Sequence, residues 1–186
     1  MEDARIIELY WQRDESAIST TDTKYGSYCY QVAYNILSDR QDSEECVSDT
    51  WLRAWNVMPP QRPDKLKLFL AKITRNLSLD CLKARYAHKR GGGEMPLILE
   101  ELQECVASDG NTESEFMARE LGRDVNAFVR SLPEREGNLF IRRYFYCESV
   151  EAAARRYGLT AGNAAVILSR TRRKLKDFLE QKGYEV

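Results

Sequence analysis

Apolar residues recur at three- and four-residue steps along most of the chain, and this spacing buries one face of an α-helix. No stretch alternates apolar and polar residues as a half-buried strand does. The sequence therefore predicts an all-α fold. The expected helices cover residues 3–13, 14–37, 38–55, 64–90, 113–131 and 133–144, with two more within 149–179.

The segment 149–179 has the local chemistry of a helix-turn-helix. Ser149 is suited to cap a first helix, Gly158 to end it in a left-handed conformation, and Thr160 to cap a second helix. The second helix is rich in arginine and lysine, which favours DNA binding. The alternative is a two-helix elbow whose basic residues only face solvent.

A proline-rich segment precedes the longest basic stretch. Residues 56–63 contain three prolines and are expected to form a stiff loop. Asp64 is expected to cap a helix running to about residue 90. The segment from Arg62 to Arg90 contains nine lysines and arginines but only two aspartates, and this excess of positive charge favours contact with a phosphate backbone.

The helix expected over 38–55 begins with a cluster of acids. Asp42 followed by Glu45 resembles a capping box, and acids suit a helix N-terminus. The same acids would equally form a patch for a basic partner. The residues leave both interpretations open.

Charge segregates along the chain although the net charge is only −1. The segment from Glu94 to Glu120 holds eight acids against one arginine and lies between two basic blocks. This pattern predicts two polyanion-binding bodies joined by an acidic connector. We expect a helical domain over 1–92, a linker with at most one short helix over 93–112, and a helix-turn-helix domain over 113–186.

Composition argues against several other classes of protein. No apolar run reaches membrane-spanning length and the N-terminus does not resemble a signal peptide, so we expect a cytoplasmic protein without membrane insertion. The five cysteines are scattered and His88 is the single histidine, which predicts buried thiols and no metal site or other cofactor. No nucleophile elbow or phosphate loop is present, so we expect no enzyme.

Five motifs, in this order, resemble those of bacterial RNA polymerase sigma factors of the extracytoplasmic-function type in the sigma-70 family. The resemblance covers nearly the whole chain. The motifs are Asp42-Ser43-Glu44-Glu45; Trp51-Leu52-Arg53-Ala54-Trp55; Phe69-Leu70 with Ile73, Asn76 and Asp80; Leu132-Pro133-Glu134-Arg135-Glu136 with Arg143-Tyr144; and Gly158-Leu159-Thr160 with Leu168 and Arg170-Thr171-Arg172.

The resemblance implies a protein that binds core RNA polymerase and directs it to promoter DNA; whether an anti-sigma factor also binds stays open. It implies three surfaces. The polymerase-binding residues would be Asp42, Glu45 and Asp49. The minus-ten element would be bound by Asn56, Met58, Arg62, Lys72, Arg75, Asn76 and Lys83. The minus-thirty-five element would be bound by Thr160, Asn163, Ala165, Val166, Arg170, Arg172, Arg173 and Lys174.

The chain departs from the family pattern at four positions. Ser48 replaces a common glutamine in the polymerase-binding helix, and Ala165, Val166 and Ile167 replace lysine, serine and arginine near the DNA-facing side. Two other functions remain open: a helix-turn-helix transcriptional regulator, and a helical adaptor that binds only proteins.

Overall fold

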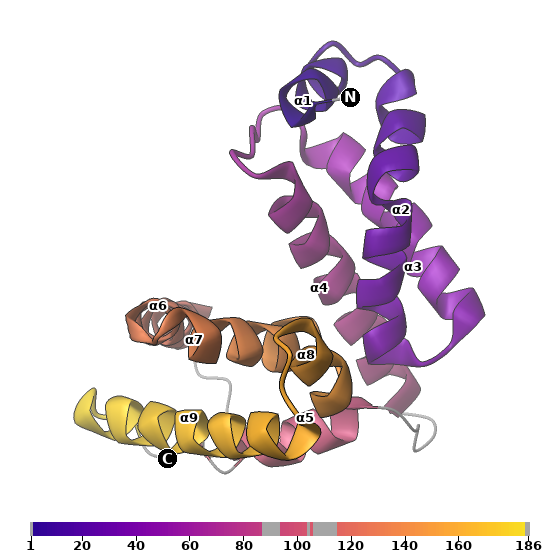
Figure 1. The fold of residues 1–186 in the computed structure, drawn as a ribbon. Helices are drawn as coiled ribbons and strands as arrows, with labels where there is room; N and C mark the ends of the chain where they lie inside the picture. Colours follow the sequence, from indigo (N-terminus) through magenta and orange to yellow (C-terminus); the bar gives the residue numbers. More distant parts are fainter. Residues whose placement is uncertain (1, 87–93, 104, 106–114, 185–186) are drawn as a thin grey trace. The chain divides into compact units, whose positions relative to one another are not determined.

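The computed structural model describes residues 2–86, 94–103, 105 and 115–184. Every regular element in those residues is a helix, so the all-α prediction is confirmed. The chain divides into two compact units, one ending at Met95 and one beginning at Pro96 (Figure 1). The helices are α1 (Asp3–Trp11), α2 (Ser16–Leu37), α3 (Arg40–Val57), α4 (Leu66–Tyr86), α5 (Glu94–Gln103), α6 (Glu115–Ser131), α7 (Glu134–Phe140), the π-helical turn η1 (Ile141–Phe145), α8 (Val150–Arg156) and α9 (Ala161–Gln181).

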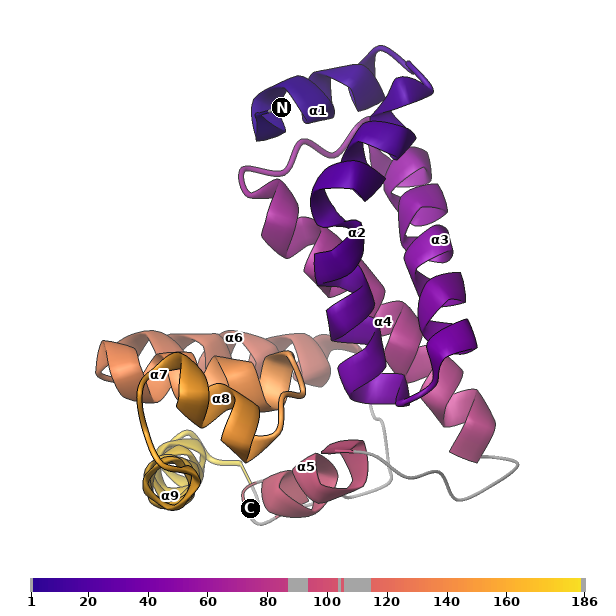
Figure 2. The same ribbon diagram turned by 45° about the vertical axis from the view of Figure 1, so that its right-hand side comes forward.

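The first unit is a bundle of α2, α3 and α4, with α1 lying across one end of it (Figure 2). Its core takes side chains from all four helices, including Ile6, Tyr10, Trp51 and Leu70. The Thr50 hydroxyl donates to the Thr74 hydroxyl at 3.0 Å in the buried contact between α3 and α4. Apolar periodicity therefore assigned the inward faces of these helices correctly.

The ends of α3 and the start of α4 differ from the sequence prediction. Asp39, not Asp42, is the N-cap of α3, and its carboxylate accepts from the Asp42 amide at 3.0 Å. The helix then continues through Val57, because proline restricts only the residue directly before it, here Met58. Residues 58–65 form the loop, and α4 begins at Leu66 after Lys65, so Asp64 does not occupy the cap position.

The second unit is arranged around α9, which packs against α6, α7 and α8. Its core includes Phe128, Leu139, Leu168, Leu175 and Leu179. The chain enters α7 through Pro133, which is the N-cap residue rather than part of the first turn. The helix expected to run to residue 144 changes to the π-helical turn η1 at Ile141.

Part of the expected linker belongs to the second unit. Within 93–112, α5 is a helix of ten residues, and its Ile98 is buried, as is Cys105 beyond its end. The Cys105 thiol donates to the carbonyl of Arg172 on α9 at 3.5 Å. The acidic composition concealed this role because one of those acids, Glu101, is neutralised by arginines far along the chain. Residues 87–93 and 106–114, which include Gly91–Gly93, lie outside the described residues.

Candidate nucleic-acid interface

The helix-turn-helix predicted from local chemistry is present in the second unit. The Ser149 hydroxyl accepts from the Ala152 amide at 3.1 Å and so caps α8. Gly158 has φ +63°, the left-handed conformation that ends α8. The Thr160 hydroxyl accepts from the Asn163 amide at 3.2 Å and so caps α9. Both caps and the turn are therefore confirmed.

The two faces of α9 separate clearly. The buried face contains Ala164, Leu168, Thr171, Leu175 and Leu179. The exposed face carries a different set: Asn163, Ala165, Val166, Arg170 and Arg173. Val166 is 49% exposed, which excludes the alternative that it belongs to the core. The outer surface therefore combines apolar side chains near the start of α9 with arginines one to two turns later.

Arg172 does not lie on this exposed face, and its prediction as a DNA contact is corrected. Its side chain is 14% exposed, and Nη1 donates to the Tyr144 hydroxyl at 2.9 Å. The same nitrogen lies 3.4 Å from Oε2 of Glu101. Arg172 directly precedes the exposed Arg173, but a step of one residue turns a helix by about 100° and moves the side chain to another face.

Two other predicted contacts in α9 already have partners within the unit. Lys174 pairs with Glu136 on α7 at 2.8 Å, although half of its side chain remains exposed. The Thr160 hydroxyl is occupied as the helix cap. Arg170 and Arg173 are therefore the basic side chains of α9 best placed to reach a phosphate.

A buried ionic network, which the sequence analysis did not find, supports this helix-turn-helix. Arg143 of η1 is 1% exposed, and its Nη2 donates to Oε1 of Glu101 at 2.7 Å. Tyr144 donates to the other oxygen of the same carboxylate at 2.7 Å. Burial alone would raise the pKa of Glu101, but donation by Arg143 and Tyr144 outweighs it and holds that pKa below the usual value.

Glu148 forms a second ionic centre just before α8. Its carboxylate, which is 5% exposed, accepts from Nη1 of Arg142 at 3.3 Å and from Nε of Arg156 at 3.0 and 3.1 Å. The sequence gives no recognisable signal for this ionic centre, because the partners of Glu148 come from η1 and from the far end of α8, six and eight positions away.

The first unit presents polar and basic side chains on α4. Lys72, Asn76 and Lys83 are exposed, and Arg75 is half-buried. Lys83 lies 3.7 Å from Asp80, a contact between two highly exposed side chains that contributes little energy. The helix therefore keeps three exposed groups able to contact a nucleic-acid backbone.

The loop of residues 58–65 differs from expectation at two predicted contacts. Met58 is fully buried in the core of the first unit, so its prediction as a DNA contact is corrected: an apolar side chain at the end of α3 fills the core instead. Arg62 pairs with Glu8 of α1 at 2.9 Å. Asn56, in the last turn of α3, is exposed as the prediction requires.

The acidic start of α3 is likewise divided between two roles. Asp42 forms an ion pair with Arg85 of α4 and its side chain is 25% exposed, so this predicted polymerase contact already has a partner within the first unit. Glu45 and Asp49 are exposed. The interpretation as a patch for a basic partner therefore stays a prediction, for which Glu45 and Asp49 are the accessible acids.

Beside these acids, α2 and α3 border a groove of about 530 Å³. Its lining includes Tyr30, Gln31, Glu44 and Ser48. Tyr34 stacks on Tyr30 with ring centroids 5.8 Å apart. On α3, Leu52 directly follows the lining residue Trp51 and is 59% exposed. Exposed aromatic and apolar groups are typical of protein interfaces.

Among the described residues, no group of histidine, cysteine and acidic side chains has the arrangement of a metal site. Four cysteines are buried and Cys81 is half-buried. Burial raises the pKa of Cys29 and of Cys46 to about 11. No helix in the described part of the chain is both long and apolar enough to cross a membrane.

Comparison with known proteins shows which proteins the chain resembles. Residues 23–87, which contain most of α2 and all of α3 and α4, match the family model for sigma-70 region 2. The chain is 25% identical over 179 residues to the ECF RNA polymerase sigma factor SigE of Mycolicibacterium smegmatis. That alignment covers 92% of this chain and 66% of the relative. Residues 23–87 therefore resemble sigma-70 region 2, and the chain is similar over most of its length to an extracytoplasmic-function sigma factor.

Proposed function

We propose that this protein binds core RNA polymerase and directs it to promoter DNA, where it assists strand separation, without itself catalysing a reaction. The observation that carries the proposal is the combination, in one chain, of a region 2 bundle with a separate helix-turn-helix unit. A repressor needs only the second of these. The cytoplasm, where polymerase and DNA meet, is the expected place of action.

The polymerase would bind the face formed by α2 and α3. The exposed acids Glu45 and Asp49 would attract a basic partner, and Tyr34 and Leu52 would supply apolar contact area. Asp42 would contribute less to this surface, because its carboxylate is already paired with Arg85. Ser48, which replaces the family's common glutamine, lines the neighbouring groove.

The minus-ten element would contact the end of α3, the loop 58–65 and α4. Extruding a base from the stack costs a few kcal/mol, so a preformed receiving surface is needed to offset it. Lys72, Asn76 and Lys83 are exposed along α4 and would hold the separated strand through its phosphates. Asn56 would contribute at the start of the loop.

The minus-thirty-five element would receive the start of α9 in its major groove. Ala165 and Val166 offer no hydrogen bonds but fit thymine methyl groups, whereas Arg170 and Arg173 would bind phosphates. The proposal therefore includes modest upstream selectivity with a bias toward A·T pairs. Replacing Ala165 by lysine should tighten binding, because it adds a cation where other family members have one.

Run-off transcription with core RNA polymerase on a randomised promoter library tests the function. The expected result is a defined transcript set that disappears when either this protein or the polymerase is omitted. DNA binding of equal strength and selectivity without polymerase would instead indicate a regulator. Absence of any salt-dependent DNA affinity, with or without polymerase, would indicate a protein-only adaptor.

A further inference from the structure

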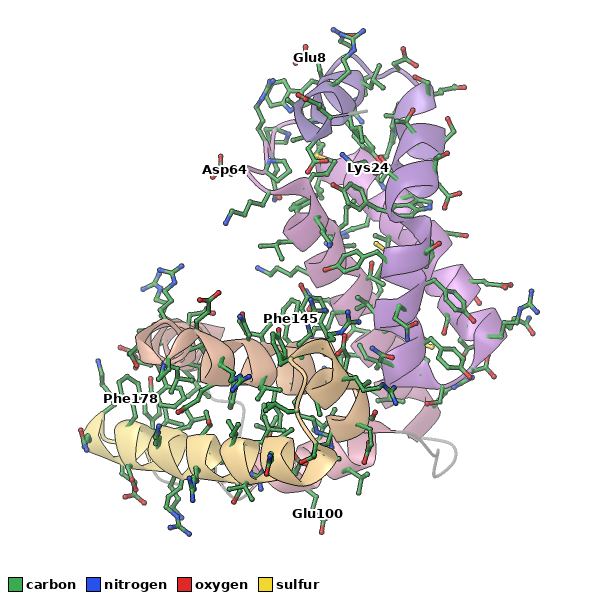
Figure 3. All side chains as sticks on the ribbon, viewed as in Figure 1. Glu8, Lys24, Asp64, Glu100, Phe145 and Phe178 are labelled. Carbon is green, nitrogen blue, oxygen red and sulfur yellow. The ribbon has the colours of Figure 1, made fainter. Side chains whose placement is uncertain are left out.

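The N-terminal helix α1 lies beside the loop 58–65, at one end of the bundle. Figure 3 shows Glu8 on α1 and Asp64 in the loop at this same end. Helix α1 precedes residue 23, where the match to sigma-70 region 2 begins. Its contacts with the loop therefore join a helix outside the matched segment to a loop inside it.

Apolar packing fixes the first residue of the loop. Met58 is 0% exposed and belongs to one core cluster with Ile6, Ile7 and Tyr10 of α1. Three of the following seven loop residues are prolines, whose backbone angle φ is restricted. Fixing Met58 against α1 therefore limits the directions that the rest of the loop can take.

Polar contacts hold the middle of the loop to the same helix. Nη2 of Arg62 lies 2.9 Å from Oε2 of Glu8. The guanidinium carbon of Arg62 also lies 5.3 Å from the ring centroid of Trp11, within the range of a cation–π interaction. Glu8 and Trp11 are three residues apart on one face of α1, so a single helix face presents both partners to Arg62.

The turn after α1 makes a third connection, to the last turn of α3. Arg13 donates from Nη1 to the carbonyl of Trp55 at 2.6 Å, and its guanidinium lies 5.3 Å from the Trp55 ring centroid. Arg13 has φ +56°, a left-handed backbone conformation that is uncommon for residues other than glycine. Such a conformation persists where the surrounding structure holds the residue in place. The contact with Trp55 is one interaction that holds Arg13 in place.

We propose that Glu8, Trp11 and Arg13 are positioning residues that hold the loop 58–65 in the geometry needed to receive the separated promoter strand. Arg62 is then the anchor of the loop rather than a contact to DNA. The inference rests on the proposed function for its DNA part. Preorganisation is the physical reason, because a loop ordered before binding does not lose conformational entropy when it captures an unstacked base.

A charge swap separates the two roles of Arg62. The variants are Glu8→Arg, Arg62→Glu and the double variant, with Glu15→Arg as control, since Glu15 is exposed and undergoes the same charge change in the same N-terminal segment. Each full-length variant is measured in two ways. The first is hydrogen exchange of the Gln61 amide, which donates to the Val57 carbonyl at 3.0 Å. The second is transcript yield with core polymerase on a promoter recovered from the library.

Each single reversal should accelerate Gln61 exchange and lower the transcript yield, both by about three- to tenfold, because attraction between partly exposed groups becomes repulsion. The double variant should return both quantities to within about twofold of the wild type. Trp11→Ala should change both in the same direction, whereas Trp11→Phe, which keeps an aromatic face, should change them less. The Glu15→Arg control should match the wild type.

Two outcomes would overturn the inference, and a third would overturn the proposed function. If Arg62 contacts DNA directly, Glu8→Arg will transcribe normally while Arg62→Glu and the double variant both fail. Unchanged Gln61 exchange in the single reversals would show that the pair does not order the loop. If wild-type protein gives no transcripts, the proposed function fails instead, and the DNA part of the inference fails with it, whereas the exchange measurement still decides whether α1 orders the loop.

Discussion

Arg143 and Glu101 form a bidentate contact in which Nη2 and Nε of the guanidinium lie 2.7 and 3.3 Å from the two carboxylate oxygens, across 42 positions of sequence. Arg143 is 1% exposed, so this carboxylate is what makes the burial of its charge possible. The contact attaches α5 to η1. A segment whose composition suggests a simple tether therefore helps to hold the helix-turn-helix unit together.

Replacing Glu101 by alanine should lower the free energy of unfolding of the second unit by about 3 kcal/mol, because it leaves a buried guanidinium without its anionic partner. Urea denaturation followed by circular dichroism measures this loss. Glu100→Ala is the matched control, since Glu100 is the exposed neighbour on the same helix and should cost less than about 0.5 kcal/mol. Equal losses for the two variants would contradict the role of the network.

Stability should also depend on pH through Glu101. Its pKa in the folded protein is lowered from 4.5 by donation from Arg143 and Tyr144, despite the opposing effect of burial. The resulting stabilisation is present above the unfolded value and disappears as the pH falls through the folded value. The free energy of unfolding should therefore decrease between about pH 5 and pH 3 more steeply for wild-type protein than for Glu101→Gln. Parallel curves would show that other carboxylates account for the acid sensitivity.

Gly158 and Gly162 should respond to alanine with opposite signs. An added Cβ would touch nothing within 4 Å at either position, so only the backbone conformation decides. Gly158 has φ +63°, and Gly158→Ala should cost about 1 kcal/mol. Gly162 is in the first turn of α9, and Gly162→Ala should stabilise the protein by about 0.5 kcal/mol. Thermal unfolding of both variants checks the prediction, which a shared sign would refute.

Replacing Arg172 should lower stability, whereas replacing its neighbour Arg173 should weaken DNA binding. Arg172→Ala should destabilise the second unit by about 2 kcal/mol, since it removes a donor from the Glu101 network, and leave the salt dependence of DNA affinity unchanged. Arg173→Ala should leave stability unchanged, weaken binding to all sequences and lower the salt slope by about one. Denaturation and salt-titrated binding of the same two variants test this. The reverse assignment of the two effects would place Arg172 on the DNA.

In the first unit, replacing Asp42 should lower stability, whereas replacing Glu45 should weaken polymerase binding. Asp42→Lys places a cation against Arg85 and should cost about 2 kcal/mol of stability. Glu45→Lys is at an exposed site and should preserve stability while weakening polymerase binding several-fold, mainly through slower association. Denaturation and a binding titration with core polymerase give the two readouts. Undiminished polymerase affinity in Glu45→Lys would remove this acid from the interface.

The sequence by itself determined the features that depend on neighbouring residues. Ser149, Gly158 and Thr160 specify the helix-turn-helix because a cap or a left-handed turn involves atoms only a few positions apart. The inward face of α9 likewise follows from the helical period alone. The five motifs in their order also resemble those of the sigma-70 family, and this resemblance is a property of the sequence alone.

Only the tertiary structure decided which charged and apolar side chains near the predicted sites are free to act outside the fold. Arg172 finds Glu101 71 positions away, Asp42 finds Arg85, and Met58 fills a core formed partly by α1. No local pattern encodes these partners, because contact between distant segments depends on how whole helices pack. The same physics made α5 part of the second unit and gave the loop 58–65 its support from Glu8 and Trp11.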